Sequence, residues 1–76
     1  MVVAFVLLNV KKGGEEKILD AFKDVEGIEY AQLVYGEYDV ILKVKRESIE
    51  DLQKFLTKEI RAIPQIEKTT TMITIK

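Results

Sequence analysis

The chain has 76 residues, 47% of them hydrophobic, and its 12 basic and 13 acidic side chains give a net charge of −1. It contains no cysteine and no histidine, which excludes a disulfide framework and the usual zinc, iron–sulfur and haem ligands. Basic and acidic residues are mixed along the chain, so the basic stripe typical of nucleic-acid binders is missing and direct DNA binding is not expected.

A domain of this size buries only about 60% of its unfolded surface, so self-association is the expected source of further stability. The N-terminal segment has no basic leader or small-residue cleavage site, and its apolar run is far shorter than the roughly 20 residues that cross a bilayer. We therefore expect a soluble, cytoplasmic protein. A charged fraction of 33% without cysteine suits a thermophilic source.

The first predicted strand covers Val2 to Val10, where every residue except Asn9 is apolar. Both alternating sets of side chains are apolar, which predicts a central strand with both faces covered. The pattern leaves open which set faces the helices. It also leaves open whether Asn9 lies at an interface rim or bonds to the adjoining loop.

The first predicted helix begins at Glu15 and Glu16, because acidic residues are favoured near the positive end of the helix dipole. Its apolar stripe, which should pack on the sheet, consists of Ile18, Leu19, Phe22 and Val25. Gly27 is the expected C-cap.

The second and third predicted strands cover Ile28 to Tyr35 and Tyr38 to Val44, with a turn between them. Gly36 can reverse the chain there because glycine tolerates positive φ. Glu37 and Asp39 lie two residues apart and should point the same way. Taken alone, these carboxylates fit a solvated turn better than a ligand site.

The second predicted helix begins at Ser48, which with Asp51 three residues later resembles a capping box. Pro64 is expected to stop this helix. Its apolar face consists of Ile49, Leu52, Phe55, Leu56, Ile60 and Ile63. The last predicted strand, Ile66 to Ile75, is rich in β-branched residues.

The predicted order is therefore β-α-β-β-α-β in one domain, residues 1–76. Two βαβ halves with right-handed crossovers interleave into an antiparallel four-stranded sheet of strand order 4-1-3-2, with both helices on one face. This is the ferredoxin-like α+β sandwich. The other face keeps an apolar set that includes Phe5 and Leu7, so we expect two copies to stack these faces as a dimer.

No catalytic constellation is recognisable, since a nucleophilic triad would lack its usual base or nucleophile. Gly13 and Gly14 carry neither a Walker nor a dinucleotide motif. An acylphosphatase-like hydrolase shares the fold but needs an arginine and an asparagine at a phosphate loop. The two arginines, Arg46 and Arg61, are remote from that glycine pair in the sequence. We expect no enzyme activity, metal or cofactor.

Several segments, in chain order, resemble the effector domain of the Lrp/AsnC (feast/famine) transcriptional regulators, also called the RAM domain. They are the apolar first strand, a Gly-Glu-Glu helix start, Val25-Glu26-Gly27-Ile28, Tyr35-Gly36-Glu37-Tyr38-Asp39 and Ile63-Pro64-Gln65-Ile66 before Thr69-Thr70-Thr71. The segment Tyr35-Gly36-Glu37-Tyr38-Asp39 resembles the family's Gly-Asp/Glu-Tyr-Asp turn. Gln65 stands where the family usually has glycine.

The resemblance implies a sensor without the family's helix-turn-helix DNA-binding domain. Single-domain members dimerise through their sheets, assemble further into rings and bind free amino acids between dimers. The family's pattern assigns ligand binding to Gly36, Glu37, Tyr38 and Asp39, with Thr69 and Thr71 of the last strand.

The partners implied are a free amino acid, further copies of the chain and a full-length Lrp/AsnC regulator modulated by co-assembly. In such a site Asp39 accepts from the ligand ammonium, while the Gly36 N–H and threonine hydroxyls hold its carboxylate. The alternative, from another class, is a ligand-free oligomerisation module with the same fold.

Overall fold

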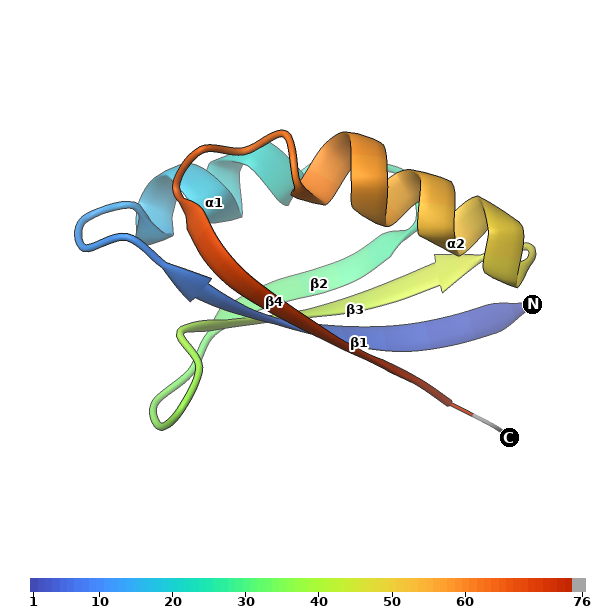
Figure 1. The fold of residues 1–76 in the computed structure, drawn as a ribbon, viewed down its shortest axis with the longest axis horizontal. Helices are drawn as coiled ribbons and strands as arrows, with labels where there is room; N and C mark the ends of the chain where they lie inside the picture. Colours follow the sequence, from blue (N-terminus) through green and yellow to red (C-terminus); the bar gives the residue numbers. More distant parts are fainter. Residues whose placement is uncertain (75–76) are drawn as a thin grey trace.

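The computed structural model describes residues 1–74 and confirms the β-α-β-β-α-β order (Figure 1). A short π-helical segment, η1, continues the second helix directly. The elements are β1 (Val2–Val10), α1 (Glu15–Phe22), β2 (Ile28–Leu33), β3 (Val40–Arg46), α2 (Ile49–Phe55), η1 (Leu56–Ile60) and β4 (Ile66–Ile73).

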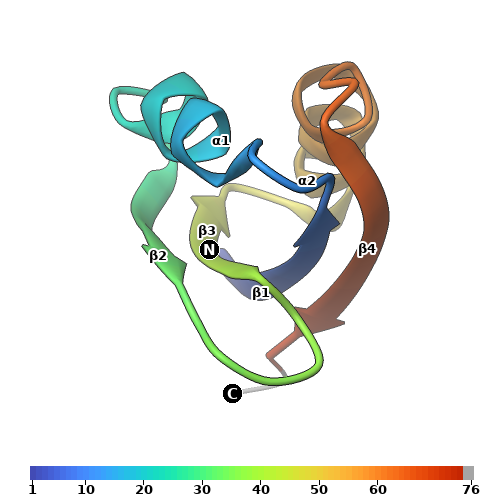
Figure 2. The same cartoon turned by 90° about the vertical axis from the view of Figure 1, so that its left-hand side faces the viewer.

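The four strands form one antiparallel sheet in the order β2-β3-β1-β4, which is the predicted order read from the other edge. The two central strands are β3 and β1. Both helices lie on the same face of this sheet (Figures 1 and 2). We call the opposite side of the sheet the uncovered face.

The strand register shows which alternating set of β1 faces the helices. Ala4, Val6 and Leu8 are completely buried, and they pair with Val44, Leu42 and Val40 of β3, which are equally buried. These side chains form one core with residues of the helices, namely Ile18, Phe22, Leu52, Phe55 and Ile60. Phe5 and Leu7 therefore point to the uncovered face and stay half-buried.

Three predicted boundaries are wrong: the C-cap of the first helix and the two strand ends at the central connection. The C-cap of α1 is Lys23 and not Gly27, because two tight turns, Val25 N–H to Phe22 O and Ile28 N–H to Val25 O, separate helix and strand. β2 ends at Leu33 and β3 begins at Val40, so residues 34–39 form a longer connection than a tight hairpin. We call these six residues the β2–β3 arm.

The second helix starts as predicted, since Ser48 Oγ accepts a hydrogen bond of 3.1 Å from the Asp51 N–H. Ile49 is not part of its apolar face: this side chain is 53% exposed, because the first turn of α2 lies at the end of the sheet (Figure 1). The helical turns end at Ile60, before Pro64 is reached. The predicted last residue of the final strand, Ile75, lies outside the described residues.

Candidate functional site

The β2–β3 arm, which carries the predicted ligand turn, projects from one end of the sheet on its uncovered side (Figures 1 and 2). Gly36 has a φ of +118°, and nothing lies within 4 Å of the position that a Cβ would take there. Glycine is therefore needed for the backbone reversal and not for close packing. The turn chemistry predicted at Gly36 is confirmed, at the tip of a longer loop.

Four hydrogen bonds that involve main-chain groups fix the arm. The Asp39 N–H donates to Leu8 O at 2.9 Å, and the Val10 N–H donates to Asp39 Oδ2 at 2.8 Å. Asn9 Nδ2 donates to Glu37 O at 2.8 Å, which decides that Asn9 bonds to the adjoining loop. The fourth bond, from the Val34 N–H to Asp39 O at 2.9 Å, closes the arm on itself. The end of the central strand thus holds the turn in place.

Asp39 occupies a special position in this arrangement. The pairing of β1 with β4 shifts register between Asn9 and Val10, with Glu67 of β4 as the extra residue, so the ladder is irregular where the carboxylate approaches. Asp39 is half-buried and accepts the backbone N–H of Val10. Its carboxylate therefore has a structural partner already, although a carboxylate has room for further donors.

The threonines of β4 divide between the two faces of the sheet. Thr69 and Thr71 stand opposite Leu8 and Val6, so they share the helix side, as the predicted alternation requires for the pair. Thr70 stands opposite Leu7 on the uncovered face, and its Oγ1 lies 3.1 Å from the Tyr38 hydroxyl. The structure thus brings Thr70, which sequence reasoning did not select, next to the turn.

A pocket of about 390 Å³ adjoins the arm and is lined by Glu15, Leu33, Val34, Tyr35 and Asp39. Two carboxylates and two aliphatic side chains share this small concave surface. Such a lining suits a ligand that combines a positive charge with an apolar group. Glu15 was placed from sequence only as a helix-start residue, and only the fold brings it beside Asp39.

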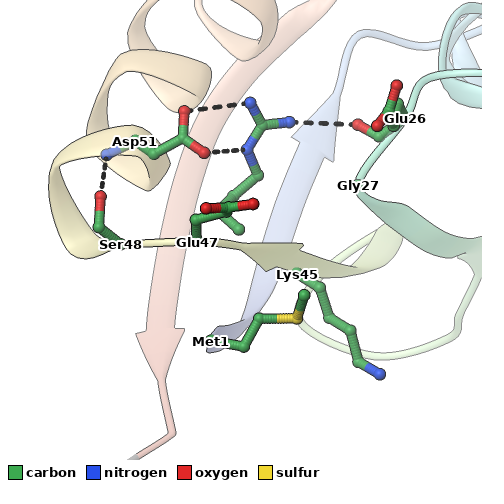
Figure 3. A pocket seen from close by; sticks show the side chains of 8 residues that line it. Met1, Glu26, Gly27, Lys45, Glu47, Ser48 and Asp51 are labelled. Atoms are coloured by element: carbon green, nitrogen blue, oxygen red, sulfur yellow. Dashed lines mark hydrogen bonds and ion pairs between the residues drawn. The ribbon is translucent and has the colours of Figure 1, made fainter.

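A larger pocket, of about 720 Å³, lies at the other end of the sheet (Figure 3). Two of its charged groups are already paired: Arg46 donates to both carboxylate oxygens of Asp51, at 3.1 and 3.2 Å, and also to the main-chain O of Glu26 at 3.2 Å. The Arg46 guanidinium also lies 4.9 Å above the ring of Phe55 and holds the pKa of Asp51 below its usual range. These contacts join β3, α2 and the turn before β2 and have a structural role.

The uncovered face combines apolar and charged side chains. Phe5, Leu7 and Ile41 lie on its central strands, with Tyr30 and Met72 on the strands beside them. Near the end remote from the arm, Glu29 binds Lys45 at 2.7 Å and Lys43 at 3.1 Å. The two ammonium groups lower the pKa of the Glu29 carboxyl. We call these three residues the charged triad.

An irregularity in β2 produces the charged triad. Ile28 pairs with Val44 and Tyr30 with Lys43, so Glu29 is an extra residue opposite β3. Such a bulge redirects side chains, and here it lets Glu29 join the lysines on the uncovered face. The sequence shows no signal for this bulge. Across residues 1–74, none of the helices has the length and apolarity needed to cross a bilayer.

Comparison with known proteins identifies relatives over the whole chain. A family model described as "Lrp/AsnC ligand binding domain" matches residues 3–76. The HTH-type transcriptional regulator FL11 of Pyrococcus abyssi is 34% identical over 74 residues, which are 97% of this chain and 48% of that protein. The chain thus spans about half the length of the curated relatives it matches.

Solved structures show the same relationship. The hypothetical protein PHS023 of Pyrococcus horikoshii has a TM-score of 0.94 and 39% identity, with 100% of this chain and 92% of that chain covered. A more distant structure is the transcriptional regulator NMB0573 of Neisseria meningitidis in complex with L-Met. It has a TM-score of 0.91 and 13% identity, with 99% of this chain and 50% of that chain covered. The Pyrococcus relatives belong to a hyperthermophilic genus, in line with the composition.

Proposed function

We propose that residues 1–76 form one amino-acid-sensing domain, because the chain belongs to the Lrp/AsnC ligand-binding domain family and the curated relatives it matches are transcriptional regulators. One observation carries this proposal. A turn with an exposed glycine backbone is fixed by hydrogen bonds beside a pocket that presents Asp39 and Glu15 together with aliphatic side chains. Its role is regulatory binding and not catalysis.

The chemistry of a free amino acid fits this arrangement. The ligand ammonium binds Asp39, assisted by Glu15, and the apolar side chain contacts Leu33 and Val34. Gly36, Glu37 and Tyr38 supply the backbone and polar groups of the turn. Thr69 and Thr71, which do not line this pocket within one chain, remain the proposed contribution of β4. Charge-assisted hydrogen bonds contribute about 1.5–3 kcal/mol each when water is excluded.

Water exclusion requires a further subunit, because the pocket is open in a single chain. We place the first contact between copies on the uncovered face, where Phe5 and Leu7 are central. Aromatic and aliphatic side chains that remain half-buried on the open face of a sheet are typical of a surface that packs against another. Dimers then meet around the arms, and the ligand is enclosed between dimers.

A site completed by assembly links ligand binding to the oligomeric state, so the amino acid stabilises whichever assembly presents the whole site. The chain then modulates a full-length regulator of the same family by co-assembly. The regulator of Neisseria meningitidis that was solved with L-Met offers a precedent for an amino acid on this fold.

The test combines a thermal-shift screen against the common amino acids with light scattering on the same samples. We expect at least one amino acid to raise Tm and to change the mass of the assembly. No response across the set would leave the ligand-free oligomerisation module as the function. Asp39→Ala should lose the response; if this variant binds every amino acid as tightly as the original chain, the proposed site is wrong.

The dimer surface is tested separately. Leu7→Asp places a charge in the middle of the uncovered face and should give monomers by light scattering. Glu59→Gln, on the exposed side of η1, is the matched surface control and should leave the mass unchanged.

A further inference from the structure

The side chain of Tyr38 is directed to β4 and not into the pocket beside the arm. Its hydroxyl lies 3.1 Å from Thr70 Oγ1, and both side chains are half-buried. Asp39 and Tyr35, the residues on either side in the turn, line the pocket, whereas Tyr38 does not. The hydroxyl of Tyr38 therefore already has a partner within the chain.

Asn9 orients the peptide between Glu37 and Tyr38. Asn9 Nδ2 donates to Glu37 O at 2.8 Å, so this carbonyl faces β1. No peptide bond of residues 1–74 is cis, and in a planar trans peptide the N–H points opposite to the C=O. The Tyr38 N–H therefore points away from Asn9. It has no hydrogen-bond partner within residues 1–74, so it is free to donate to a ligand.

The two side chains that hold this peptide come from neighbouring strands. Asn9 lies on β1 and Thr70 on β4, both on the uncovered side, and the register makes them diagonal neighbours. They bind consecutive residues of the turn, Glu37 and Tyr38. We call Asn9 and Thr70 the two anchors.

The main chain alone does not fix the orientation of this peptide. Before it, Gly36 has a φ of +118° and no main-chain hydrogen bond within residues 1–74, and glycine has wide conformational freedom. After it, Asp39 is fixed, because its N–H donates to Leu8 O at 2.9 Å. The peptide thus lies between a free residue and a fixed one, and the anchors decide which way it faces.

We propose that Asn9 and Thr70 are positioning residues for the carboxylate of the ligand. Asn9 turns the peptide so that the Tyr38 N–H donates to this carboxylate at the rim of the pocket, and Thr70 holds the same residue through its phenol. Neither anchor touches the ligand. Tyr38 gives its main chain to the ligand and its hydroxyl to the fold.

The chemistry of an amino acid fits this division. Its ammonium and carboxylate are carried by one carbon atom, so the groups that bind them must lie close together. Adjacent residues, Asp39 for the ammonium and Tyr38 for the carboxylate, meet this requirement. The inference rests on the proposed function and adds the donor for the carboxylate and the two residues that support it.

Thr70→Val and Tyr38→Phe test the bond to the phenol, because each removes one hydroxyl and keeps the shape. Each common amino acid is titrated into the original chain and the variants by calorimetry. We expect either variant to lower the affinity by about three- to tenfold, and the double variant to lose no more than one of them. Thr70→Ser keeps the hydroxyl and should keep the affinity. The matched controls, Thr57→Val and Tyr30→Phe, remove hydroxyls that make no hydrogen bond within residues 1–74 and should change nothing.

Asn9→Leu tests the other anchor with a readout that a purely structural role would not move. The variant keeps the size of the side chain and removes the donor to Glu37 O. Each amino acid that binds is compared with its carboxamide, which keeps the ammonium and lacks the carboxylate. We expect Asn9→Leu to weaken the amino acid by about three- to tenfold and the carboxamide by less than about twofold. Equal losses for both compounds would contradict a role in carboxylate binding.

Amide hydrogen exchange without ligand measures the hold on the turn directly. In Thr70→Val and in Asn9→Leu, the Asp39 N–H should exchange about three- to tenfold faster relative to amides in the middle of β3. Unchanged exchange at Asp39 in both variants would show that the anchors do not hold the turn, and the inference would be wrong.

The outcomes separate this inference from the proposed function. If the original chain binds an amino acid and both anchor variants bind it equally well, the inference is wrong and the proposed function stands. A loss in Tyr38→Phe without a loss in Thr70→Val would place the phenol on the ligand and overturn the positioning role. If the original chain binds no amino acid, the proposed function is wrong and this inference fails with it.

Discussion

Replacing Asp39 by alanine should destabilise the protein through the end of β1. The carboxylate accepts the Val10 N–H at 2.8 Å in a half-buried position, where the strand is irregular. Hydrogen bonds to a charged group contribute about 1.5–3 kcal/mol, and the variant leaves the N–H without its acceptor. For a domain of this length, each kcal/mol lowers Tm by about 4–8 °C, so the expected decrease is about 6–24 °C.

The assay is urea unfolding followed by far-UV circular dichroism, at one fixed protein concentration because association contributes to stability. Asp39→Asn keeps an oxygen acceptor and should cost less, about 0.5–1.5 kcal/mol. Glu37→Ala, two residues away, removes a side chain that makes no hydrogen bond or ion pair in residues 1–74 and should change stability by less than about 0.5 kcal/mol.

Amide hydrogen exchange identifies the cause of the loss. In Asp39→Ala the Val10 N–H should exchange faster, while amides in the middle of β3 change only with global stability. If Asp39→Ala unfolds within about 0.5 kcal/mol of the original chain, the carboxylate does not stabilise the strand end and the argument from this bond fails.

Two further predictions concern the other end of the sheet. Gly27→Ala should destabilise the fold more than Gly36→Ala. Both positions have positive φ, so alanine at either one carries a backbone strain of about 1–3 kcal/mol. A Cβ at Gly27 would also lie 3.0 Å from Lys45 O, and this close contact adds about 1–3 kcal/mol to the loss of stability. Equal Tm values for the two variants would contradict this. Arg46 holds the pKa of Asp51 below 3.8, so the pair stabilises the fold fully above that pH and loses its effect as pH falls through the lowered value. The Tm gap between the original chain and Asp51→Asn should therefore be constant near neutral pH and shrink in acid; a gap unchanged in strong acid would refute it.

Periodicity predicted the element order, the strand order and the one-sided cover of the sheet. It left the faces of β1 open, because Phe5 and Leu7 are as apolar as Val6 and Leu8 and alternation cannot distinguish two apolar sets. The register with β3 and β4 resolves this. Ile49 shows the same limit: helical spacing places it on the apolar face, but the helix begins at the end of the sheet, where nothing covers it.

The candidate site was predictable as a turn and not as a network. Gly36 and its neighbours stand out in the sequence, whereas Asn9, Val10 and Thr70 reach the turn only through the pairing of distant strands. Bulges at Glu29 and beside Val10 also escape pattern analysis, because an extra residue in a strand leaves alternation nearly intact over so short a run.

The position of β1 in the sheet also affects how the protein is made. Its neighbours are β3 and β4, and Thr74 bonds to Val3 O across 71 positions of sequence. Of the four strands, β1 is translated first, and its second neighbour, β4, is translated last. Pairings at such separation close slowly, and an apolar strand that waits for them is open to association with other chains. The strand at the centre of the finished sheet is thus the one exposed longest during synthesis.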